Sequence, residues 1–486
     1  MVYPKTTLDK VGSSVGLPLS IMHTTTLIPE KKFRIKVIDQ RVEKNWENIL
    51  QDELFKGDVL CVAVSAMTGS QIGWALKTAE IVRRISPQIP LIWGGVHPSL
   101  YPRQTIMDPL VDIIVVNEAD FTFPELVDAL DTGNPLDSIK GLCFKDKQGN
   151  ITITPEREFA KLEEIPLPRY NLISDMKPYF LNLYSTKNAL SLVAGKGCPH
   201  RCGFCYNILF NKQKWRALSA QEIVKRMKVL ITMGAESIDI IDDNFFTSMT
   251  RAKELAELLQ QENIKINMVS NCRADYIARW NMDYLKMLYD AGFKEFFVGI
   301  ESGNDDMLKH MKKDLTVEQV IVANRKLREV GIRPIYSFIA GFPGETIEQI
   351  QDTINLMIKL LDENPNISMT SLKVYTPFPG SPMYDECVQM GMPIPKTLAE
   401  WSNYHYNSTT YSSWRSKEMA KLIEKLSYLT YFLDQKTMTH HLAGNNKMLA
   451  NLIKLYSKLV FWRAKKHFYT FTPEVFVMKQ LRAYIE

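Results

Sequence analysis

Three cysteines near the middle of the chain have the types and spacing that bind a metal cluster. Cys198, Cys202 and Cys205 lie in residues 195–206, directly after a short apolar run. Thiolates at this spacing can hold three irons of a cubane cluster, and the fourth iron then stays open to a substrate or cofactor. Zinc completed by His200 is the alternative, but His200 lies between two of the cysteines, where it would strain a tetrahedral site. The spacing therefore favours an iron–sulfur cluster.

Polar residues follow the later apolar runs of the same region and are candidates for binding a small ligand. They lie in residues 242–246, 271–273, 299–302 and 339–345. For any one of them, a loop cap or a salt bridge at the end of a strand is an equally good explanation. As a set they favour a ligand site, because the carboxyl ends of parallel barrel strands open on the same face.

The elements that would position these residues alternate between short apolar runs and amphipathic stretches. The runs are residues 189–194, 237–241, 266–270, 295–300, 335–340 and 370–376. Six successive strand–helix units predict a partial (β/α)6 barrel of the TIM type, an open relative of the eight-stranded barrel. The cysteine segment follows the first of these strands.

The first part of the chain repeats this alternation and predicts a second sheet. Its apolar runs are residues 33–38, 59–64, 90–93 and 111–116, and residues 70–85 have apolar side chains at helical spacing. Such a pattern predicts a Rossmann-like, doubly wound parallel sheet. A hairpin over residues 140–153 and a Pro-rich stretch follow.

We therefore expect an α/β protein of three parts. Residues 1–150 form the Rossmann-like domain, residues 165–385 the partial barrel, and residues 386–486 a C-terminal helical region. In the last part, residues 416–431 and 447–466 have the amphipathic pattern of helices.

The cysteine segment resembles the cluster-binding motif of the radical S-adenosylmethionine (SAM) superfamily, including an aromatic residue, Phe204, before the third cysteine. The resemblance implies that Cys198, Cys202 and Cys205 bind a [4Fe–4S] cluster whose open iron chelates SAM. An electron from the cluster then cleaves SAM to a 5′-deoxyadenosyl radical. The SAM contacts that the resemblance implies are Asp243, Arg273, Glu301 and Ser302.

A doubly wound domain before such a barrel resembles the cobalamin-binding domain of the cobalamin-dependent members of this superfamily. Residues 93–99 and 117–120 match the family's third and fourth strand-end loops. Small residues there let the backbone approach a large flat cofactor in the crevice beyond the strand ends. The implied cobalamin contacts are Ser65, Thr68, Gly69, Gly94, Gly95, Val96, His97, Asn117 and Glu118.

Two features of residues 1–150 depart from many cobalamin proteins. No Asp-x-His-x-x-Gly segment is present, so the resemblance implies cobalamin without the usual histidine below its ring. His97 is a candidate contact, and a turn histidine hydrogen-bonded to backbone is the alternative. Residues 1–20 have no strong strand pattern, so we expect the family's first strand to be degenerate, replaced or absent.

The resemblance implies a cobalamin-dependent radical SAM methyltransferase. In that chemistry the adenosyl radical abstracts hydrogen from an unactivated carbon, which then takes a methyl group from methylcobalamin. A cobalamin-dependent cyclase of the anaerobic porphyrin-cyclase kind is the alternative within the family. A non-catalytic iron–sulfur or cobalamin sensor is the alternative outside it, and a sensor would not cleave SAM when reduced.

Composition limits the partners. The 486 residues include 59 Lys plus Arg and 54 Asp plus Glu, and this net charge of +5 is too small to predict nucleic-acid binding. No apolar run reaches the roughly 18 residues of a bilayer span, so we expect a cytoplasmic protein. The family resemblance implies an electron donor such as flavodoxin or ferredoxin. The substrate stays open among a small molecule, a lipid, a tetrapyrrole and a protein side chain.

Aromatic and basic residues are interleaved over residues 461–471. The simplest interpretation is an amphipathic helix packed on its own domain with its cations in solvent. An anionic lipid surface or stacked nucleic bases are the alternatives.

Overall fold

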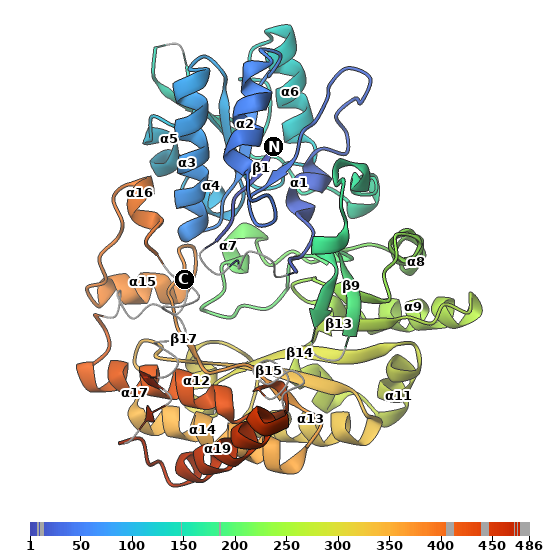
Figure 1. The fold of residues 1–486 in the computed structure, drawn as a ribbon, viewed down its shortest axis with the longest axis vertical. Helices are drawn as coiled ribbons and strands as arrows, with labels where there is room; N and C mark the ends of the chain where they lie inside the picture. Colours follow the sequence, from blue (N-terminus) through green and yellow to red (C-terminus); the bar gives the residue numbers. More distant parts are fainter. Residues whose placement is uncertain are drawn as a thin grey trace. The chain divides into compact units, whose positions relative to one another are not determined.

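The computed structural model describes the chain except residues 7–8, 10–13, 147, 184–185, 405–412, 439–446, 471, 474 and 477–486. Contacts divide the chain into two units (Figure 1). The first unit comprises Met1–Asn182 and Ile394–Tyr406, and the second comprises Leu183–Pro393 and Asn407–Glu486. Among the described residues, no helix combines the length and the apolar character needed to cross a membrane.

A seven-stranded sheet in the order β2-β1-β3-β4-β5-β6-β7 forms the centre of the first unit. Its strands are β1 (Val2–Tyr3), β2 (Ile38–Asp39), β3 (Val62–Ser65), β4 (Leu91–Gly94), β5 (Ile113–Val115), β6 (Leu142–Lys145) and β7 (Ile151–Ile153). The first five strands are parallel, and β6 and β7 are antiparallel. The order of the parallel strands is that of a doubly wound fold, so the Rossmann-like prediction is confirmed, together with its hairpin.

The first strand is present but degenerate. Val2 is buried and pairs with Ile38 on one side and Val64 on the other. Because β1 has only two residues, most of the run predicted at residues 33–38 has no strand to bond to, and only its last residue joins β2.

Helices cover the sheet of the first unit. They are α1 (Leu19–Thr24), α2 (Trp46–Phe55), α3 (Ser70–Ile85), α4 (Val96–Leu100), α5 (Pro102–Met107), α6 (Thr122–Thr132) and α16 (Leu398–Trp401), with 3-10 turns η1 (Leu162–Glu164), η2 (Tyr170–Leu172) and η3 (Lys177–Tyr179). The bounds of α3 match the prediction, since Ile72, Ala75, Ala79 and Val82 form one buried face.

The second unit contains a curled sheet in the order β16-β15-β14-β13-β12-β9-β8, with β17 beside β15. Its strands are β8 (Leu181–Leu183), β9 (Thr186–Leu192), β12 (Ser237–Ile240), β13 (Asn267–Asn271), β14 (Phe293–Glu301), β15 (Arg333–Ala340), β16 (Ser368–Met369) and β17 (Lys373–Val374). All pairs from β9 to β16 are parallel. This is the half barrel that the six strand–helix units predict, with the last predicted strand split into β16 and β17.

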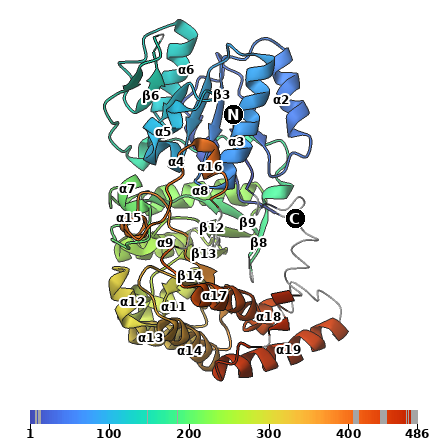
Figure 2. The ribbon, with the colours of Figure 1, turned by 90° about the vertical axis from the view of Figure 1, so that its left-hand side faces the viewer.

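The helices of the second unit follow its strands. They are α7 (Asn207–Phe210), α8 (Ala220–Thr232), α9 (Met249–Gln261), α10 (Ala274–Arg279), α11 (Met282–Asp290), α12 (Asp305–His310), α13 (Val317–Val330), α14 (Ile347–Glu363), α15 (Pro382–Gln389), α17 (Lys417–Leu429), α18 (Gln435–Met438) and α19 (Lys447–Lys465), with turns η4 (Phe245–Thr247) and η5 (Thr430–Phe432). Capping boxes at Thr316 and Thr346 begin α13 and α14. Figure 2 shows α13, α14, α17 and α19 gathered at one end of this unit.

The residues after 385 are divided between the two units. Ile394–Tyr406 joins the first unit, where the Trp401 indole donates to Gln104 (2.8 Å) and Gln104 donates to the Pro395 carbonyl (2.8 Å). We call Ile394–Tyr406 the strap. The described residues from 413 onward pack instead on the half barrel.

Candidate cluster and cofactor sites

Backbone contacts fix the cysteine loop at the carboxyl end of β9. The loop begins with β10 (Gly195–Lys196), which pairs with β11 (Arg216–Ala217). At Gly197 the backbone φ is +83°, and a Cβ there would collide with the Lys214 carbonyl. Gly203 donates to the Met311 carbonyl (2.7 Å) and accepts from the Met383 amide (2.9 Å). Close backbone approach therefore requires glycine at position 197.

Two of the sulfurs receive N–H groups from neighbouring strand ends. The Asn244 amide lies 3.6 Å from Cys198 Sγ, and the Arg273 guanidinium lies 3.8 Å from Cys202 Sγ. Donors at these positions stabilise negative sulfur. The arrangement fits thiolate ligands of an iron–sulfur cluster.

Burial opposes ionisation of the Cys198 and Cys205 thiols when they are free. It raises the pKa of Cys205 to about 12 and also raises the pKa of Cys198. Free thiols would therefore be protonated at neutral pH, and bound irons would supply the charge that holds them as thiolates. Among the described residues, no three His, Cys, Asp or Glu side chains converge around one metal ion. A cubane does not need such convergence, because each thiolate binds its own iron.

The zinc alternative has no support from His200. Its Nε2 pairs with the Tyr276 hydroxyl at 2.7 Å, and Tyr276 also accepts from the Asn244 amide (3.2 Å). Burial lowers the pKa of His200 to about 4, so this ring is neutral at physiological pH. His200 therefore supports the loop from the side of α10.

The two aspartates after β12 hold the start of the loop. Asp243 accepts from the Gly197 amide (2.8 Å). Asp242 is buried, accepts from the Ala194 amide (2.7 Å) and lies 3.9 Å from the Arg251 guanidinium. Burial raises the pKa of Asp242 to about 7. The structure thus gives Asp243 a loop-holding contact.

Arg273 links the end of β13 to the loop. Besides its contact with Cys202, it pairs with Asp275 (2.7 Å) and donates to the Lys313 carbonyl (2.6 Å). Its side chain is nearly buried, so these partners fix its direction. The predicted residue Arg273 is therefore brought to the cluster loop.

Glu301 and Lys313 form a buried ion pair at the end of β14. Their charged atoms lie 2.9 Å apart, and only 8% and 10% of the two side chains are exposed. Burial lowers the pKa of Lys313, but the carboxylate of Glu301 outweighs it, so the pKa is raised. Glu301 has a left-handed φ of +73° where the sheet register shifts. The ammonium of Lys313 lies 5.4 Å from the Phe204 ring, which brings the pair beside the cysteine loop.

Ser302 differs from the other predicted SAM contacts. Its hydroxyl is buried, lies 3.4 Å from the Thr353 hydroxyl and accepts from the Asn304 amide (3.2 Å). These partners belong to the turn before α12 and to α14. In this structure Ser302 makes the contacts of a loop cap, which was the alternative to a role in ligand binding.

The turn after β15 is clamped by two charged side chains, of which Glu345 lies in the predicted strand-end segment 339–345 and Arg415 does not. Glu345 accepts from the Gly341 and Phe342 amides, and Arg415 donates to the Gly341 carbonyl (2.7 Å). Burial raises the pKa of Glu345 to about 7. The Phe342 ring stacks on Tyr375 at 4.5 Å. Arg415 lies far along the chain from Gly341, so no local pattern could have found it.

In the first unit, the predicted glycines bring two strand-end loops into contact. Gly95 has a φ of +98°, and a Cβ there would lie 2.8 Å from the Ala66 carbonyl oxygen and 3.1 Å from the Ser65 hydroxyl. Gly94 ends β4 directly before it. The loops after β3 and β4 thus meet through backbone, and only glycine allows this approach at position 95.

His97 is enclosed rather than open to a ligand. Its Nδ1 pairs with the Thr68 hydroxyl (3.0 Å), and its ring lies 5.2 Å from Trp401 of the strap. The side chain is fully buried, and Nε2 has no hydrogen-bond partner among the described residues. Burial lowers the pKa of His97 to about 3. The hydrogen-bond partner of the ring is thus a side chain rather than backbone, and a contact of His97 with cobalamin stays a prediction.

The remaining predicted residues lie at the same sheet edge. Gly69 has a φ of +116°, and a Cβ there would lie 2.7 Å from the Tyr404 carbonyl oxygen of the strap. Asn117 donates through its backbone to the Ser99 hydroxyl (2.8 Å) and through its amide to Glu156 (2.7 Å). Val96 begins α4, and Glu118 follows β5, both half-buried.

Comparisons with known proteins match both units. The Radical SAM superfamily model matches residues 192–357, and the B12 binding domain model matches residues 8–127. A Pyrococcus horikoshii protein named an uncharacterized methyltransferase is 26% identical over 474 residues, covering 94% of this chain and 98% of its own. An anaerobic magnesium-protoporphyrin IX monomethyl ester cyclase of Synechocystis sp. is 28% identical, covering 71% of this chain and 68% of its own.

A solved structure shares the fold over nearly the whole chain. It is that of the cobalamin-dependent S-adenosylmethionine radical enzyme OxsB with aqua-cobalamin and S-adenosylmethionine bound. The match covers 99% of this chain and 74% of that chain, with a TM-score of 0.76 at 19% identity.

The cysteine loop and the doubly wound sheet each coincide with one of the matched domains. A [4Fe–4S] cluster and SAM are the cofactors of the radical SAM domain, and cobalamin is the cofactor of the B12 binding domain. The residues present fit a cluster, because N–H donors of Asn244 and Arg273 are directed at the cysteine sulfurs. At the edge of the doubly wound sheet, Gly69 and Gly95 allow the loops to pack closely against neighbouring backbone. The chain thus combines a radical SAM domain with a B12 binding domain.

Proposed function

We propose that this protein transfers a methyl group to an unactivated carbon of its substrate. The observation that carries the proposal is that the similarity to a methyltransferase-named relative spans 94% of this chain and 98% of the relative. The similarity to the cyclase spans 71% of this chain. When bound, the cluster and SAM supply a 5′-deoxyadenosyl radical, and cobalamin supplies the methyl group.

The chain's own residues support this chemistry by holding the cofactors. Cys198, Cys202 and Cys205 would bind three irons, and the N–H groups of Asn244 and Arg273 would stabilise the sulfurs when the cluster is reduced. A non-acidic C–H bond cannot be broken by a general base of ordinary pKa, which is why a radical route is required.

For SAM binding we assign Glu301 and Asn244 the leading roles. Asn244 Oδ1 is buried without a hydrogen-bond partner among the described residues, so it can accept from a donor of the ligand. Glu301 is held beside the loop by Lys313. Asp243 and Arg273 would act mainly by positioning the loop, and Ser302 by capping its turn.

We also propose roles for the residues predicted to contact cobalamin, from their positions at the edge of the doubly wound sheet. Ser65, Gly69, Gly94 and Gly95 would face the ring through backbone and small side chains. Thr68 and His97 would support this surface from within, since they pair with each other. Val96, Asn117 and Glu118 would complete the edge.

A cobalamin-dependent cyclase is the second candidate, favoured by the similarity to the magnesium-protoporphyrin cyclase. We propose a flavodoxin or ferredoxin as electron donor and the cytoplasm as location. The substrate class stays among small molecules, lipids, tetrapyrroles and protein side chains.

A test needs no knowledge of the substrate. The anaerobically reconstituted protein is reduced in the presence of SAM that carries a deuterated methyl group. Its corrin is then analysed by mass spectrometry. A methyltransferase forms deuterated methylcobalamin together with S-adenosylhomocysteine. A cyclase forms 5′-deoxyadenosine without labelled methylcobalamin. A sensor forms neither product, which would exclude both enzymatic proposals.

A further inference from the structure

Among the residues that the structure describes, helix α19 packs on its neighbours along one face. Ile453, Ser457, Val460 and Ala464 are buried on the side that contacts α14. An ion pair between Lys465 and Asp362 (2.8 Å) joins the two helices. The sequence-based interpretation of a helix packed on its own domain therefore describes one side of α19.

A second side of α19 is apolar and exposed. Its side chains, with their exposed fractions, are Met448 (74%), Leu452 (55%), Leu455 (68%), Leu459 (48%) and Trp462 (56%). Successive members are three or four residues apart, so they form one continuous stripe. Single exposed apolar residues are ordinary, but a continuous stripe marks an interaction surface. We call these five residues the α19 stripe.

A row of lysines runs along the edge of the stripe. Its members are Lys447, Lys454, Lys458 and Lys465. All four are exposed, and the helix contains no acidic residue. Neither Lys454 nor Lys458 has an ion-pair partner in the described part of the chain, so both charges are available to an anionic surface.

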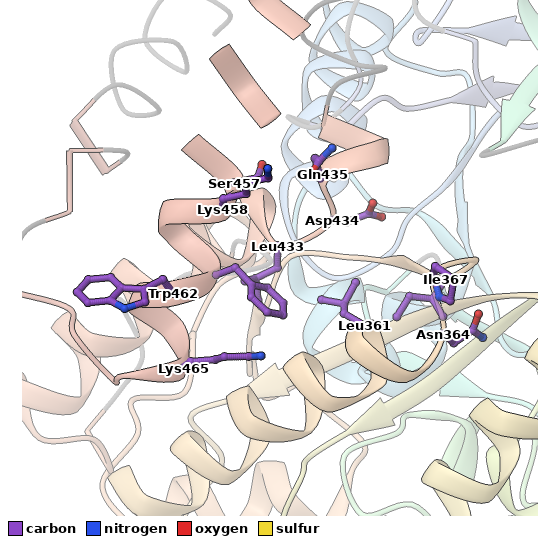
Figure 3. A pocket seen from close by; sticks show the side chains of 12 residues that line it. Leu361, Asn364, Ile367, Leu433, Asp434, Gln435, Ser457, Lys458, Trp462 and Lys465 are labelled. Carbon is purple, nitrogen blue, oxygen red and sulfur yellow. The ribbon is translucent and has the colours of Figure 1, made fainter. Parts of the chain in front are cut away.

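A cavity of about 590 Å³ opens beside the lysine row (Figure 3). Leu361 and Leu433 supply apolar lining from the half-barrel side, and Phe461, Lys458 and Lys465 contribute from α19. Asp434 also borders the cavity, but its carboxylate is buried and accepts from the Met369 amide (3.0 Å). The cavity therefore combines apolar walls with two cations.

Three partners could cover the α19 stripe: a second copy of the chain, nucleic acid or an anionic bilayer. The charge of the lysines and the apolar character of the stripe favour one of them. A second copy would bring two lysine rows together without an acid on either, which opposes self-association. Nucleic acid would satisfy the lysines but leave the leucines without an apolar partner. An anionic bilayer accommodates both, because its acyl region takes up the stripe and its headgroups pair with the lysines.

We propose that α19 is an interfacial membrane anchor. Its stripe inserts at the boundary of headgroups and acyl chains, its lysines contact lipid phosphates, and the adjoining cavity receives part of one anionic lipid. Trp462 lies at the end of the stripe, where an indole favours the bilayer interface. This surface is independent of the cluster loop and of methyl transfer.

The test is vesicle sedimentation of the full-length holoprotein. Vesicles of phosphatidylcholine alone are compared with vesicles that also contain phosphatidylglycerol, at low and high salt. We expect binding to the anionic vesicles that weakens as salt rises. Lys454→Gln with Lys458→Gln should weaken binding by roughly thirtyfold, from about fivefold per lysine. Leu452→Glu with Leu455→Glu should abolish it, because carboxylates would enter the apolar region.

Matched controls separate a surface effect from misfolding. Met107 on α5 of the first unit is also an exposed apolar residue (67%), and Met107→Glu should leave vesicle binding unchanged. SAM cleavage in solution by the reduced protein should be the same in all variants, which keeps this test separate from the proposed function.

Three results would overturn the anchor. One is a monomeric protein that does not sediment with anionic vesicles. Another is equal vesicle binding by the wild type and the Leu452→Glu, Leu455→Glu variant. The third is a dimer by light scattering that this variant converts to monomer, since the stripe would then be a surface for a second copy.

Discussion

At the scale of single residues, the cluster loop depends on N–H groups that are directed at sulfur. Asn244 and Arg273 come from two different strand ends, yet both reach cysteine sulfurs of the same loop. Each also bonds a second group, Tyr276 or Asp275, which fixes its orientation. These donors are thus in place to stabilise the thiolates once irons bind.

Removing one such donor should change the cluster's electronic properties without removing the cluster. In Asn244→Ala, Cys198 Sγ loses its N–H donor, so the reduced cluster is less stabilised and its reduction potential becomes more negative. Redox titration followed by electron paramagnetic resonance measures this shift, with iron content as the check on occupancy. Asn267→Ala, at the exposed start of β13, is the control. An unchanged potential would contradict the role of Asn244.

Breaking the buried ion pair should destabilise the second unit. In Glu301→Gln the ammonium of Lys313 stays buried without its counter-charge, and we expect a loss of about 3 kcal/mol in the free energy of unfolding. Glu301→Gln combined with Lys313→Met removes both charges and should recover most of that loss. Denaturant unfolding followed by circular dichroism compares the three proteins. A double variant as unstable as the single variant would show that the pair itself is not the cause.

His97 should make the first unit sensitive to acid. Burial lowers its pKa to about 3 in the folded state, against an ordinary value of 6.5. The folded state therefore favours the neutral ring, so stability is complete above pH 6.5 and is lost as the pH falls toward 3. At pH 5.5 the expected cost is about 1.4 kcal/mol.

The measurement is the difference in thermal unfolding midpoint between pH 7.5 and 5.5 for the wild type and for His97→Phe. The variant has no ring to protonate at this position, so its midpoint should fall less. Parallel pH profiles for the two proteins would mean that His97 does not carry this sensitivity.

At the scale of elements, the strap is a short segment that the first unit acquires from late in the chain. The Trp401 ring lies against the His97 ring. The Tyr404 carbonyl oxygen lies 2.7 Å from the position that a Cβ on Gly69 would take. The strap therefore closes over the starts of α3 and α4, at the strand ends where the cobalamin contacts are proposed.

A methyl group at Gly69 should release the strap. Gly69→Ala would place its Cβ against the Tyr404 carbonyl, at a φ of +116° that non-glycine residues avoid. We expect faster proteolysis within residues 394–404. We also expect weaker cobalamin binding, which the absorbance of the corrin measures. Gly133→Ala is the control, because Gly133 also has a positive φ but its Cβ would meet nothing within 4 Å. Equal proteolysis of both variants would contradict the steric argument.

At the scale of the whole molecule, the two cofactor domains coincide with the two compact units. The B12 binding domain match lies in the first unit, and the radical SAM match lies in the second. Each unit has its own sheet and its own set of close backbone approaches. The cofactor sites should therefore respond separately to cofactor removal.

Hydrogen exchange on the intact protein tests this separation. Adding hydroxocobalamin to the Cys198→Ala, Cys202→Ala, Cys205→Ala variant should protect peptides of residues 62–118 and the described part of the strap. The same variant should lack the iron and the visible absorption of the cluster. Protection confined to peptides of the second unit, or iron retained by the triple variant, would contradict the assignment of the sites.

The strand ends and the cysteine spacing were predictable because they are local. Thiol spacing, apolar runs and positive-φ glycines depend on neighbours along the chain, so the sequence predicts the half barrel, the doubly wound sheet and the loop at residues 195–206. The first strand was expected to be degenerate, replaced or absent, and β1 is a degenerate strand of two residues held by pairing on both sides.

The residues that only the tertiary structure reveals act across long separations in sequence. Arg415 reaches the turn at Gly341, and Trp401 covers His97. The periodicity of apolar residues along the sequence does not predict such contacts, because they form only when distant elements pack together. The same reason explains α19: its sequence is amphipathic, but only packing against α14 shows that one apolar side is buried and another is left to solvent.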